Sequence, residues 1–291
     1  MTVHRKILTQ HGFVDKDLLT YPYEERGLQF GDGIYEVIRI YHGDYYLLTE
    51  HVERLFRSAA AIKLTVPYNK EQVYHKLAEL LEINDVKGDA KVYLQITRGS
   101  AARDHVFPDT EPNFYAYVQD LPRPLTELKN GVSVITQEDE RWQNCYIKSL
   151  NLLPNILAKQ EAKEQNCFEA ILHRKEKVTE CSSSNVYIVK DGKIYTHPET
   201  NNILHGCVRS KVKTLAQNLN IPLIEEAFTL EDLQTADEVF LTSSNAEVMP
   251  IISIDHKQVQ DGKPGTKTIS LQKAYEQDAK IEQDASIFQV Q

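Results

Sequence analysis

The feature that most constrains the fold of this chain is a break in its sequence pattern at residues 120–131. On both sides of the break, apolar residues recur at the spacing of strands and helices, whereas the segment itself has no period. Pro122 and Pro124 favour extended backbone in the residues that precede them. The chain has 291 residues, which suffice for one large or two modest cores. We therefore expect a small domain over 1–119, an extended interdomain linker over 120–131 and a large domain over 132–291.

Before the break, the pattern alternates between strand and helix. Residues that favour strands fill Ile34–Tyr41, and a turn containing glycine then returns the chain as a hairpin. Thr49 and Asn69 are each placed to cap a helix with one apolar face. Apolar and polar residues alternate over Lys91–Arg98, and Asn113–Val118 shows a second strand pattern. These elements predict a small α+β unit.

After the break, strand and helix patterns alternate again. Asp191–Gly192 lies between two strand patterns and is a strong hairpin signal. Strands are expected near Val132–Thr136, Ala170–His173, Val186–Val189, Ile194–Thr196, Glu238–Thr242 and Ile251–Ile254, and helices near Asn151–Asn166 and Val208–Asn220. The whole chain is therefore predicted to have an α+β fold.

Composition and charge exclude several classes of protein. Hydrophobic residues at 41% and charged residues at 26% are ordinary for a globular protein. A net charge of -9 argues against sequence-independent binding of nucleic acid. No segment approaches the roughly 18 apolar residues of a membrane span, and residues 1–10 lack the apolar core of a signal peptide. The four cysteines lie far apart, without a disulfide framework or zinc spacing, so we expect reduced thiols, no metal and a cytoplasmic location.

Two polar residues stand where they could carry chemistry. Lys148 follows an aromatic–aliphatic pair and precedes an expected helix, in whose first turn Pro154 is tolerated. The partial positive charge at a helix N-terminus favours the neutral amine that attacks an aldehyde. Glu180 enters the turn Ser182–Ser183–Ser184–Asn185, where it is either an exposed turn residue or a functional carboxylate. The residues alone leave both interpretations open.

The segments Lys-Ser-Leu-Asn-Leu-Leu at 148–153 and Glu-Cys-Ser-Ser-Ser-Asn at 180–185 resemble those of the D-amino-acid aminotransferases. These enzymes are a branch of the fold-type IV pyridoxal-phosphate enzymes, and the resemblance covers about Arg26 to Gln272. It implies a two-domain fold with a larger, β-barrel-like α+β domain. It also implies pyridoxal 5'-phosphate on Lys148, Glu180 at the ring nitrogen, and ping-pong transamination between a D-amino acid, of the D-alanine or D-glutamate type, and a 2-oxo acid.

The same resemblance implies further residues that hold the cofactor. Arg54 matches a phosphate-contacting arginine, although periodicity alone makes it a polar-face residue. Leu204 matches the aliphatic residue that packs on the ring. The remaining candidates offer hydroxyl groups or the free amides of a helix N-terminus: Ser183, Cys207, Val208, Ser243 and Ser244. Relatives often have threonine in place of Val208, so one hydroxyl contact is lost here.

Arg103 and His105 form the Arg-x-His pair that binds the substrate carboxylate in this branch, together with a tyrosine that matches Tyr35. The resemblance implies that the neighbouring subunit supplies the pair, and hence a homodimer. Arginine suits a carboxylate because two N–H groups meet two oxygens. Gly31-x-Gly33 is not a dinucleotide motif, because the third glycine is missing and a strand follows.

Other functions remain as alternatives. A branched-chain L-amino-acid aminotransferase or an aminodeoxychorismate lyase would share the fold, the cofactor and the lysine. Ser210-x-x-Lys213 and Ser183-Ser184-Asn185 match motifs of penicillin-binding serine hydrolases, but in reversed order and without Lys-Thr-Gly. A cofactor-binding protein without turnover is a further alternative.

Overall fold

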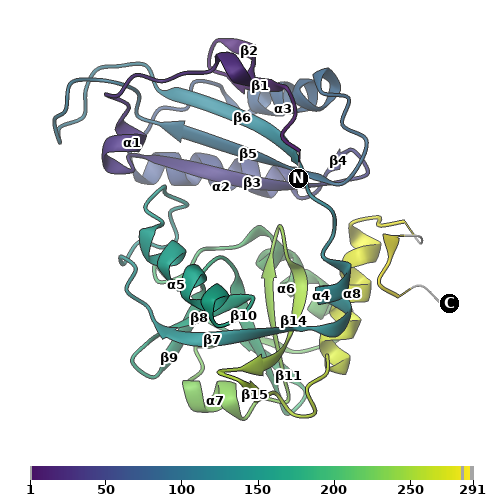
Figure 1. The fold of residues 1–291 in the computed structure, drawn as a ribbon. Helices are drawn as coiled ribbons and strands as arrows, with labels where there is room; N and C mark the ends of the chain where they lie inside the picture. The colour runs from purple at the N-terminus through teal and green to yellow at the C-terminus, as the bar shows by residue number, and fades with distance from the viewer. Residues whose placement is uncertain (1, 283–284, 289–291) are drawn as a thin grey trace. The chain divides into compact units, whose positions relative to one another are not determined.

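The computed structural model describes residues 2–282 and 285–288. The backbone contacts divide the chain into two compact units (Figure 1). Unit 1 comprises Met1–Pro122 and Ile147–Asn151, and unit 2 comprises Arg123–Tyr146 and Leu152–Gln291. The segment that contains Lys148 therefore belongs to the unit formed by the N-terminal part of the chain. The domain boundaries predicted from the sequence, 1–119 and 132–291, stay predictions about independent folding.

The predicted linker at 120–131 is not extended throughout, and this expectation is corrected. Residues Leu125–Asn130 form helix α4, which begins directly after Pro124. Leu128 lies in the core of unit 2, and Arg123 is 8% exposed. The Arg123 guanidinium donates hydrogen bonds to Glu247 at 2.7 Å and Glu276 at 2.8 Å. Burial of Leu128 and the ion pairs of Arg123 stabilise this segment, which the spacing of apolar residues does not predict.

Unit 1 is a six-stranded sheet in the order β2-β1-β6-β5-β3-β4. The outer strands, β1 (Lys6–Thr9), β2 (Gly12–Asp15) and β4 (Asp44–Tyr45), are short. The long central strands are antiparallel, and their bounds are Gly33–Tyr41 for β3, Ala90–Thr97 for β5 and Asn113–Asp120 for β6. The side chains of β5 and β6 alternate between a buried and a half-exposed face, as predicted for Lys91–Arg98, whereas Ile38–Tyr41 at the end of β3 are all buried.

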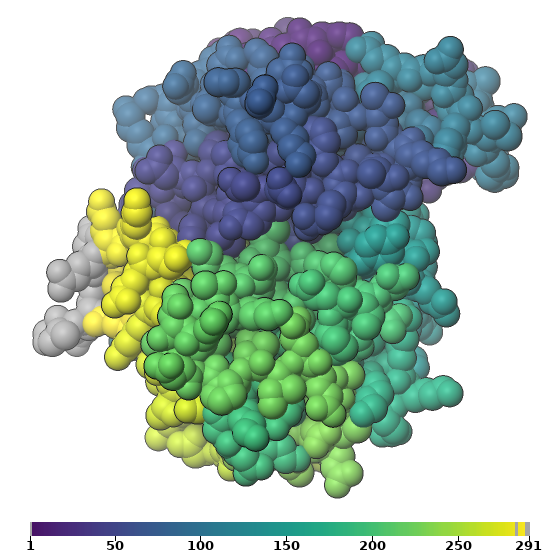
Figure 2. All heavy atoms as spheres, turned by 180° about the vertical axis from the view of Figure 1, so that it is seen from behind, coloured from purple at the N-terminus to yellow at the C-terminus, as the bar shows by residue number. Residues whose placement is uncertain are grey.

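Two helices, α2 (Leu48–Ala61) and α3 (Lys70–Ile83), pack against this unit, and Figure 2 shows them at its surface from behind. Asn69 caps α3 in a capping box, which confirms the predicted start. The predicted cap of α2 is wrong, because the helix begins at Leu48 after Leu47 and no side chain caps it. The short helices η1 (Lys16–Leu18) and α1 (Arg26–Phe30) complete the unit.

Unit 2 is a nine-stranded sheet in the order β12-β11-β10-β13-β14-β7-β8-β9, with β15 paired to β14. Figure 1 shows that this sheet is curled and not flat. The strand bounds are Val132–Glu138 (β7), Glu169–Arg174 (β8), Lys177–Cys181 (β9), Asn185–Lys190 (β10), Lys193–Thr196 (β11), Leu223–Glu225 (β12), Glu238–Ser243 (β13), Glu247–Ile254 (β14) and Lys257–Gln258 (β15). The predicted hairpin at Asp191–Gly192 joins β10 to β11 and is confirmed.

Four helices accompany this sheet besides α4 in the described residues: α5 (Leu153–Glu164), α6 (Cys207–Asn218), α7 (Leu230–Gln234) and α8 (Thr266–Asp278). Helix α5 begins two residues later than expected, with Pro154 in its first turn. Among the described residues, no helix is long and apolar enough to cross a membrane. The predicted α+β architecture of two parts, the second with a curled sheet, is confirmed.

Candidate active site

In unit 1 the structure brings Lys148 to Tyr35. The segment Ile147–Asn151 runs beside the start of β3, where the Tyr35 amide donates to the Lys148 carbonyl at 3.0 Å. The Lys148 amide donates to Ser58 Oγ of α2 at 3.2 Å. The Lys148 Nζ then lies 4.2 Å from the centre of the Tyr35 ring. Both predicted residues are half-buried, and their backbones are fixed by the same strand.

Two glycines make this approach possible. Gly31 ends α1 in the left-handed conformation, with φ 64°. A Cβ added to Gly33 would lie 2.5 Å from the Ile96 carbonyl oxygen of the neighbouring strand. A tight turn at Gly31 and close strand pairing at Gly33 therefore explain the two glycines. This agrees with the prediction that Gly31-x-Gly33 is not a dinucleotide-binding motif.

Arg54 is held by a buried acid that the sequence did not reveal. Its Nε and Nη2 each donate to the Glu36 carboxylate at 2.8 Å, and His51 Nδ1 lies 2.7 Å from Glu36 Oε2. All three side chains are buried. Burial alone would raise the pKa of Glu36, but the Arg54 charge and His51 hold that pKa well below its usual range. Glu36 is therefore ionised and orients the Arg54 guanidinium.

In unit 2, Glu180 lies on β9 and is 4% exposed. Its carboxylate accepts hydrogen bonds from Arg141 Nη1, from Asn185 Nδ2 at 3.0 Å and from the Leu204 amide at 3.0 Å. Burial raises the pKa of Glu180, and the Arg141 charge and the Leu204 amide oppose the rise. The exposed-turn interpretation of Glu180 is thus excluded, since it is a buried acid with several donors.

Asn185 connects Glu180 to the predicted phosphate-binding residues. Its Nδ2 also donates to the Leu204 carbonyl at 2.9 Å, and a Cβ on Gly206 would lie 2.2 Å from its Oδ1. Gly206 precedes α6, whose first residues are Cys207 and Val208 and whose N-terminus has no side-chain cap. On the other side, Asn185 pairs with Thr242 of β13, which Ser243 and Ser244 follow. In unit 2, Asn185 therefore contacts Glu180 and Leu204 and lies beside the residues that precede α6 and end β13.

The serine turn makes a contact that was not expected. The hydroxyl groups of Ser182, Ser183 and Ser184 donate to the carboxylate of Glu169 at 3.2, 2.7 and 2.9 Å. The Ser183 amide donates to the same carboxylate. Glu169 is 1% exposed, so it fixes the turn from inside unit 2. The predicted contact of Ser183 with a cofactor stays a prediction.

Sequence reasoning also missed Arg141 and Asp139. The Nε and Nη2 of Arg141 donate to the two oxygens of Asp139 at 2.8 and 2.9 Å. The Thr179 hydroxyl donates to Asp139 at 2.9 Å from the residue before Glu180. Burial would raise the pKa of Asp139, but Arg141 lowers it. From the sequence alone, a buried Asp-x-Arg pair in a loop cannot be distinguished from two exposed charged residues.

Arg103 and His105 make their contacts with α1. Both are exposed on the loop between β5 and β6, and both contact Phe30 of α1. Within the described part of the chain, neither has a hydrogen bond or ring contact with Lys148 or Tyr35.

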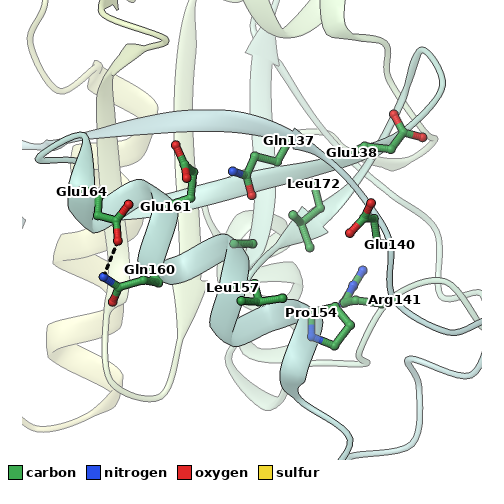
Figure 3. A pocket seen from close by; sticks show the side chains of 11 residues that line it. Gln137, Glu138, Glu140, Arg141, Pro154, Leu157, Gln160, Glu161, Glu164 and Leu172 are labelled. Atoms are coloured by element: carbon green, nitrogen blue, oxygen red, sulfur yellow. Dashed lines mark hydrogen bonds between the residues drawn. The ribbon is translucent and has the colours of Figure 1, made fainter.

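A cavity of about 550 Å³ in unit 2 contains none of the predicted site residues (Figure 3). The end of β7, α5 and Leu172 of β8 line it. Its acidic residues are Glu138, Glu140, Glu161 and Glu164, and Arg141 at its edge is already paired with Asp139 and Glu180. This charge disfavours an anionic ligand in the cavity, which meets the predicted site through the hydrogen bond that Arg141 donates to Glu180.

The fold is that of known aminotransferases. A branched-chain aminotransferase of Thermoproteus uzoniensis, solved with norvaline, superposes with a TM-score of 0.87 and 27% identity over 97% of both chains. A T.th. branched-chain amino acid aminotransferase, solved with pyridoxamine 5'-phosphate, gives 0.88 and 24% identity over 97% of this chain and 96% of that one.

Residues 33–254 match the model of the family described as amino-transferase class IV, and the chain belongs to this family. The D-alanine aminotransferase of Staphylococcus haemolyticus is 47% identical over 272 residues, which are 93% of this chain and 96% of that protein. A Listeria monocytogenes D-alanine aminotransferase is 47% identical over 270 residues, 91% of this chain and 93% of that protein. The predicted fold-type IV aminotransferase of the D-amino-acid branch is thus confirmed.

Proposed function

We propose that the protein transfers the amino group of a D-amino acid, of the D-alanine or D-glutamate type, to a 2-oxo acid in a ping-pong reaction. The observation that carries this proposal is the 47% identity with enzymes named D-alanine aminotransferase. Solved branched-chain enzymes share the fold at 24 to 27% identity. Substrate preference depends on individual side chains, so the more similar relatives support the D-amino-acid assignment.

The cofactor in this proposal is pyridoxal 5'-phosphate, and the donor set of unit 2 fits it. Glu180 is a buried acid suited to a protonated ring nitrogen, and the uncapped N-terminus of α6 suits a phosphate. In unit 2, the amides of Cys207 and Val208 and the hydroxyls of Ser243 and Ser244 would hold the phosphate, with Leu204 and Ser183 beside the ring. Arg54 of unit 1 stays a predicted phosphate contact. When bound, the cofactor supplies an aldehyde for the amino group and a ring that accepts electrons from the Cα–H bond.

The chain's own residues would then move and hold protons. Lys148 would hold the cofactor through its amine, and its Nζ would take the proton from the substrate Cα and pass it to the cofactor's aldehyde carbon. The Glu180 carboxylate keeps a proton on the ring nitrogen. Burial raises the pKa of Glu180, and the Arg141 charge opposes that rise.

Arg103 and His105 would bind the substrate carboxylate in the site of the partner subunit, and Tyr35 would bind it from the same subunit as Lys148. The lack of contact between the pair and Lys148 within the described chain supports this arrangement. Val106 and Phe107, beside the pair, are 72% and 54% exposed. A partner subunit would cover these apolar side chains.

A tyrosine cluster in unit 1 supports a homodimer. On the half-exposed sheet face, the Tyr93 ring stacks on Tyr35 at 5.8 Å and contacts Tyr115 and Tyr117, both tilted, at 6.1 and 5.4 Å. The opposite face is buried. Aromatic residues are enriched at protein interfaces, so we propose that a second copy covers this face. The four buried, unpaired cysteines support a cytoplasmic location.

Borohydride reduction followed by peptide mapping tests the cofactor assignment. We expect the pyridoxyl label on Lys148, and a label on any other lysine overturns the site. D-alanine with 2-oxoglutarate should turn over, with little or no turnover of L-leucine. Preference for L-leucine would establish the branched-chain alternative, which the shared fold supports. Pyruvate release from aminodeoxychorismate would establish the lyase.

A further inference from the structure

The loop that carries Arg103 and His105 is exposed, yet one aromatic ring contacts both side chains. The Arg103 guanidinium carbon lies 4.8 Å from the centre of the Phe30 ring. The His105 ring centre lies 5.5 Å from the same ring, tilted by 46°. Phe30 is the last residue of α1, directly before the Gly31 turn. One side chain therefore sets the positions of both carboxylate-binding groups relative to each other.

Arg26 fixes the backbone between these groups. It is 3% exposed, its Nη1 donates to the Asp104 carbonyl at 2.6 Å, and its Nε donates to Asp32 at 2.9 Å. Its guanidinium carbon also lies 4.7 Å from the centre of the Phe30 ring. Asp104 stands between Arg103 and His105, so this hydrogen bond holds the centre of the Arg-x-His motif. Asp32 keeps Arg26 in place and also binds Arg98 at the end of β5.

Such contacts matter because a mobile loop loses conformational freedom on binding. Ordering a side chain rich in rotamers at an interface costs free energy. Attraction between a guanidinium and the face of an aromatic ring restricts the guanidinium before the ligand arrives. The contacts of Phe30 and Arg26 therefore reduce the cost of binding a carboxylate.

We propose that Phe30 and Arg26 are positioning residues that preorganise Arg103 and His105 for the substrate carboxylate in the partner subunit's site. The inference rests on the proposed role of the Arg-x-His pair. It adds that α1, whose Phe30 contacts Arg26, Arg103 and His105, controls substrate affinity in the other subunit. Phe30 acts through Arg103 and His105 and does not touch the substrate.

Substitution of Phe30 in the holoenzyme tests the positioning role. Phe30→Leu removes the ring at similar size, and we expect the KM for D-alanine to rise about tenfold with kcat nearly unchanged. Phe30→Tyr keeps the ring and should retain KM within about twofold. Phe56→Leu removes another half-buried ring, 5.8 Å from Lys70 Nζ on the same unit, and should leave KM unchanged. Unchanged KM in Phe30→Leu, or equal loss in both leucine variants, overturns the proposal.

Mixed dimers test the subunit on which Phe30 acts. When Phe30→Leu is combined with Lys148→Ala, the remaining Lys148 is in the Phe30→Leu subunit. Its partner has an intact loop, so KM should return to the wild-type value with about half the kcat per dimer, since one of two sites has lost its lysine. A KM that stays raised places the action of Phe30 in its own subunit and overturns the inference.

The same pairing with Arg103→Leu separates this inference from the proposed function. If Arg103 acts on the partner's site, this mixed dimer also recovers a wild-type KM. Failure of the Arg103 pair contradicts the shared site itself. If the wild-type KM returns in the mixed dimer with Arg103→Leu but not in the one with Phe30→Leu, only the positioning role of Phe30 is contradicted.

Discussion

The buried cluster of Glu36, Arg54 and His51 allows a stability prediction with a worked magnitude. Glu36→Gln removes a charge that accepts two hydrogen bonds from Arg54 and lies beside His51. The side chain of Glu36 is 1% exposed and that of Arg54 is 6% exposed. Loss of one partner from a buried ion pair leaves an uncompensated charge and costs about 3–5 kcal/mol. The unfolding entropy of about 2.1 cal/mol/K per residue amounts to about 0.6 kcal/mol/K for 291 residues, so we expect the Tm to fall by about 5–8 °C at pH 7.

Thermal unfolding followed by circular dichroism measures this effect, and Glu53→Gln provides the matched control. Glu53 pairs with Lys70 at 3.1 Å, but both side chains are about half exposed, so its loss should cost less than about 1 kcal/mol. Equal and small shifts for the two variants would refute the argument that burial gives the Glu36 pair its strength.

The difference between wild type and Glu36→Gln should also depend on pH. The folded-state pKa of Glu36 is lowered by Arg54 and His51, against the opposing effect of burial. Its ionisation therefore contributes stability that is full above the unfolded-state value near 4.5 and is lost as pH falls towards the lowered folded-state value. The difference in Tm should narrow below that unfolded-state value. A difference that is constant with pH would show that ionisation of Glu36 is not its source.

Three substitutions test the proposed site. Arg103→Leu should raise the KM for D-alanine at least about tenfold with little change in cofactor affinity, because it removes a charged hydrogen-bonding partner. Steady-state kinetics and cofactor titration measure the two effects. An equal loss of substrate affinity and cofactor affinity contradicts the role of Arg103. In Arg141→Met, burial raises the pKa of Glu180 without the opposing Arg141 charge, so the acid limb of the pH profile of kcat/KM should move to higher pH. An acid limb that does not move refutes the effect of Arg141 on Glu180. Val208→Thr adds a hydroxyl at the start of α6 and should tighten cofactor binding about three- to tenfold in fluorescence titration; weaker binding would place the phosphate elsewhere.

Local signals predicted much of the fold because they depend on neighbours along the chain. Asn69 and Gln72 are three residues apart, so a capping box at the start of α3 is visible in the sequence. Asp191–Gly192 similarly determines the turn between β10 and β11. Helix α8 was missed because Thr268, Gln272 and Glu276 are buried in it beside apolar residues. Gln272 donates to the carbonyls of Leu128 and Val248, partners that no periodicity can show.

The sequence by itself determined the family, the lysine and the acid of the candidate site, because the chemistry of an amine and a carboxylate needs those residue types in recognisable segments. Only the tertiary structure decided what surrounds them. Arg141 meets Glu180 across 39 residues, and Glu36 meets Arg54 across 18. Such pairs form only after strands and helices become neighbours, and the dry interior then sets their charge. A pattern along one chain records which face of an element is buried, but not which distant side chain it will contact.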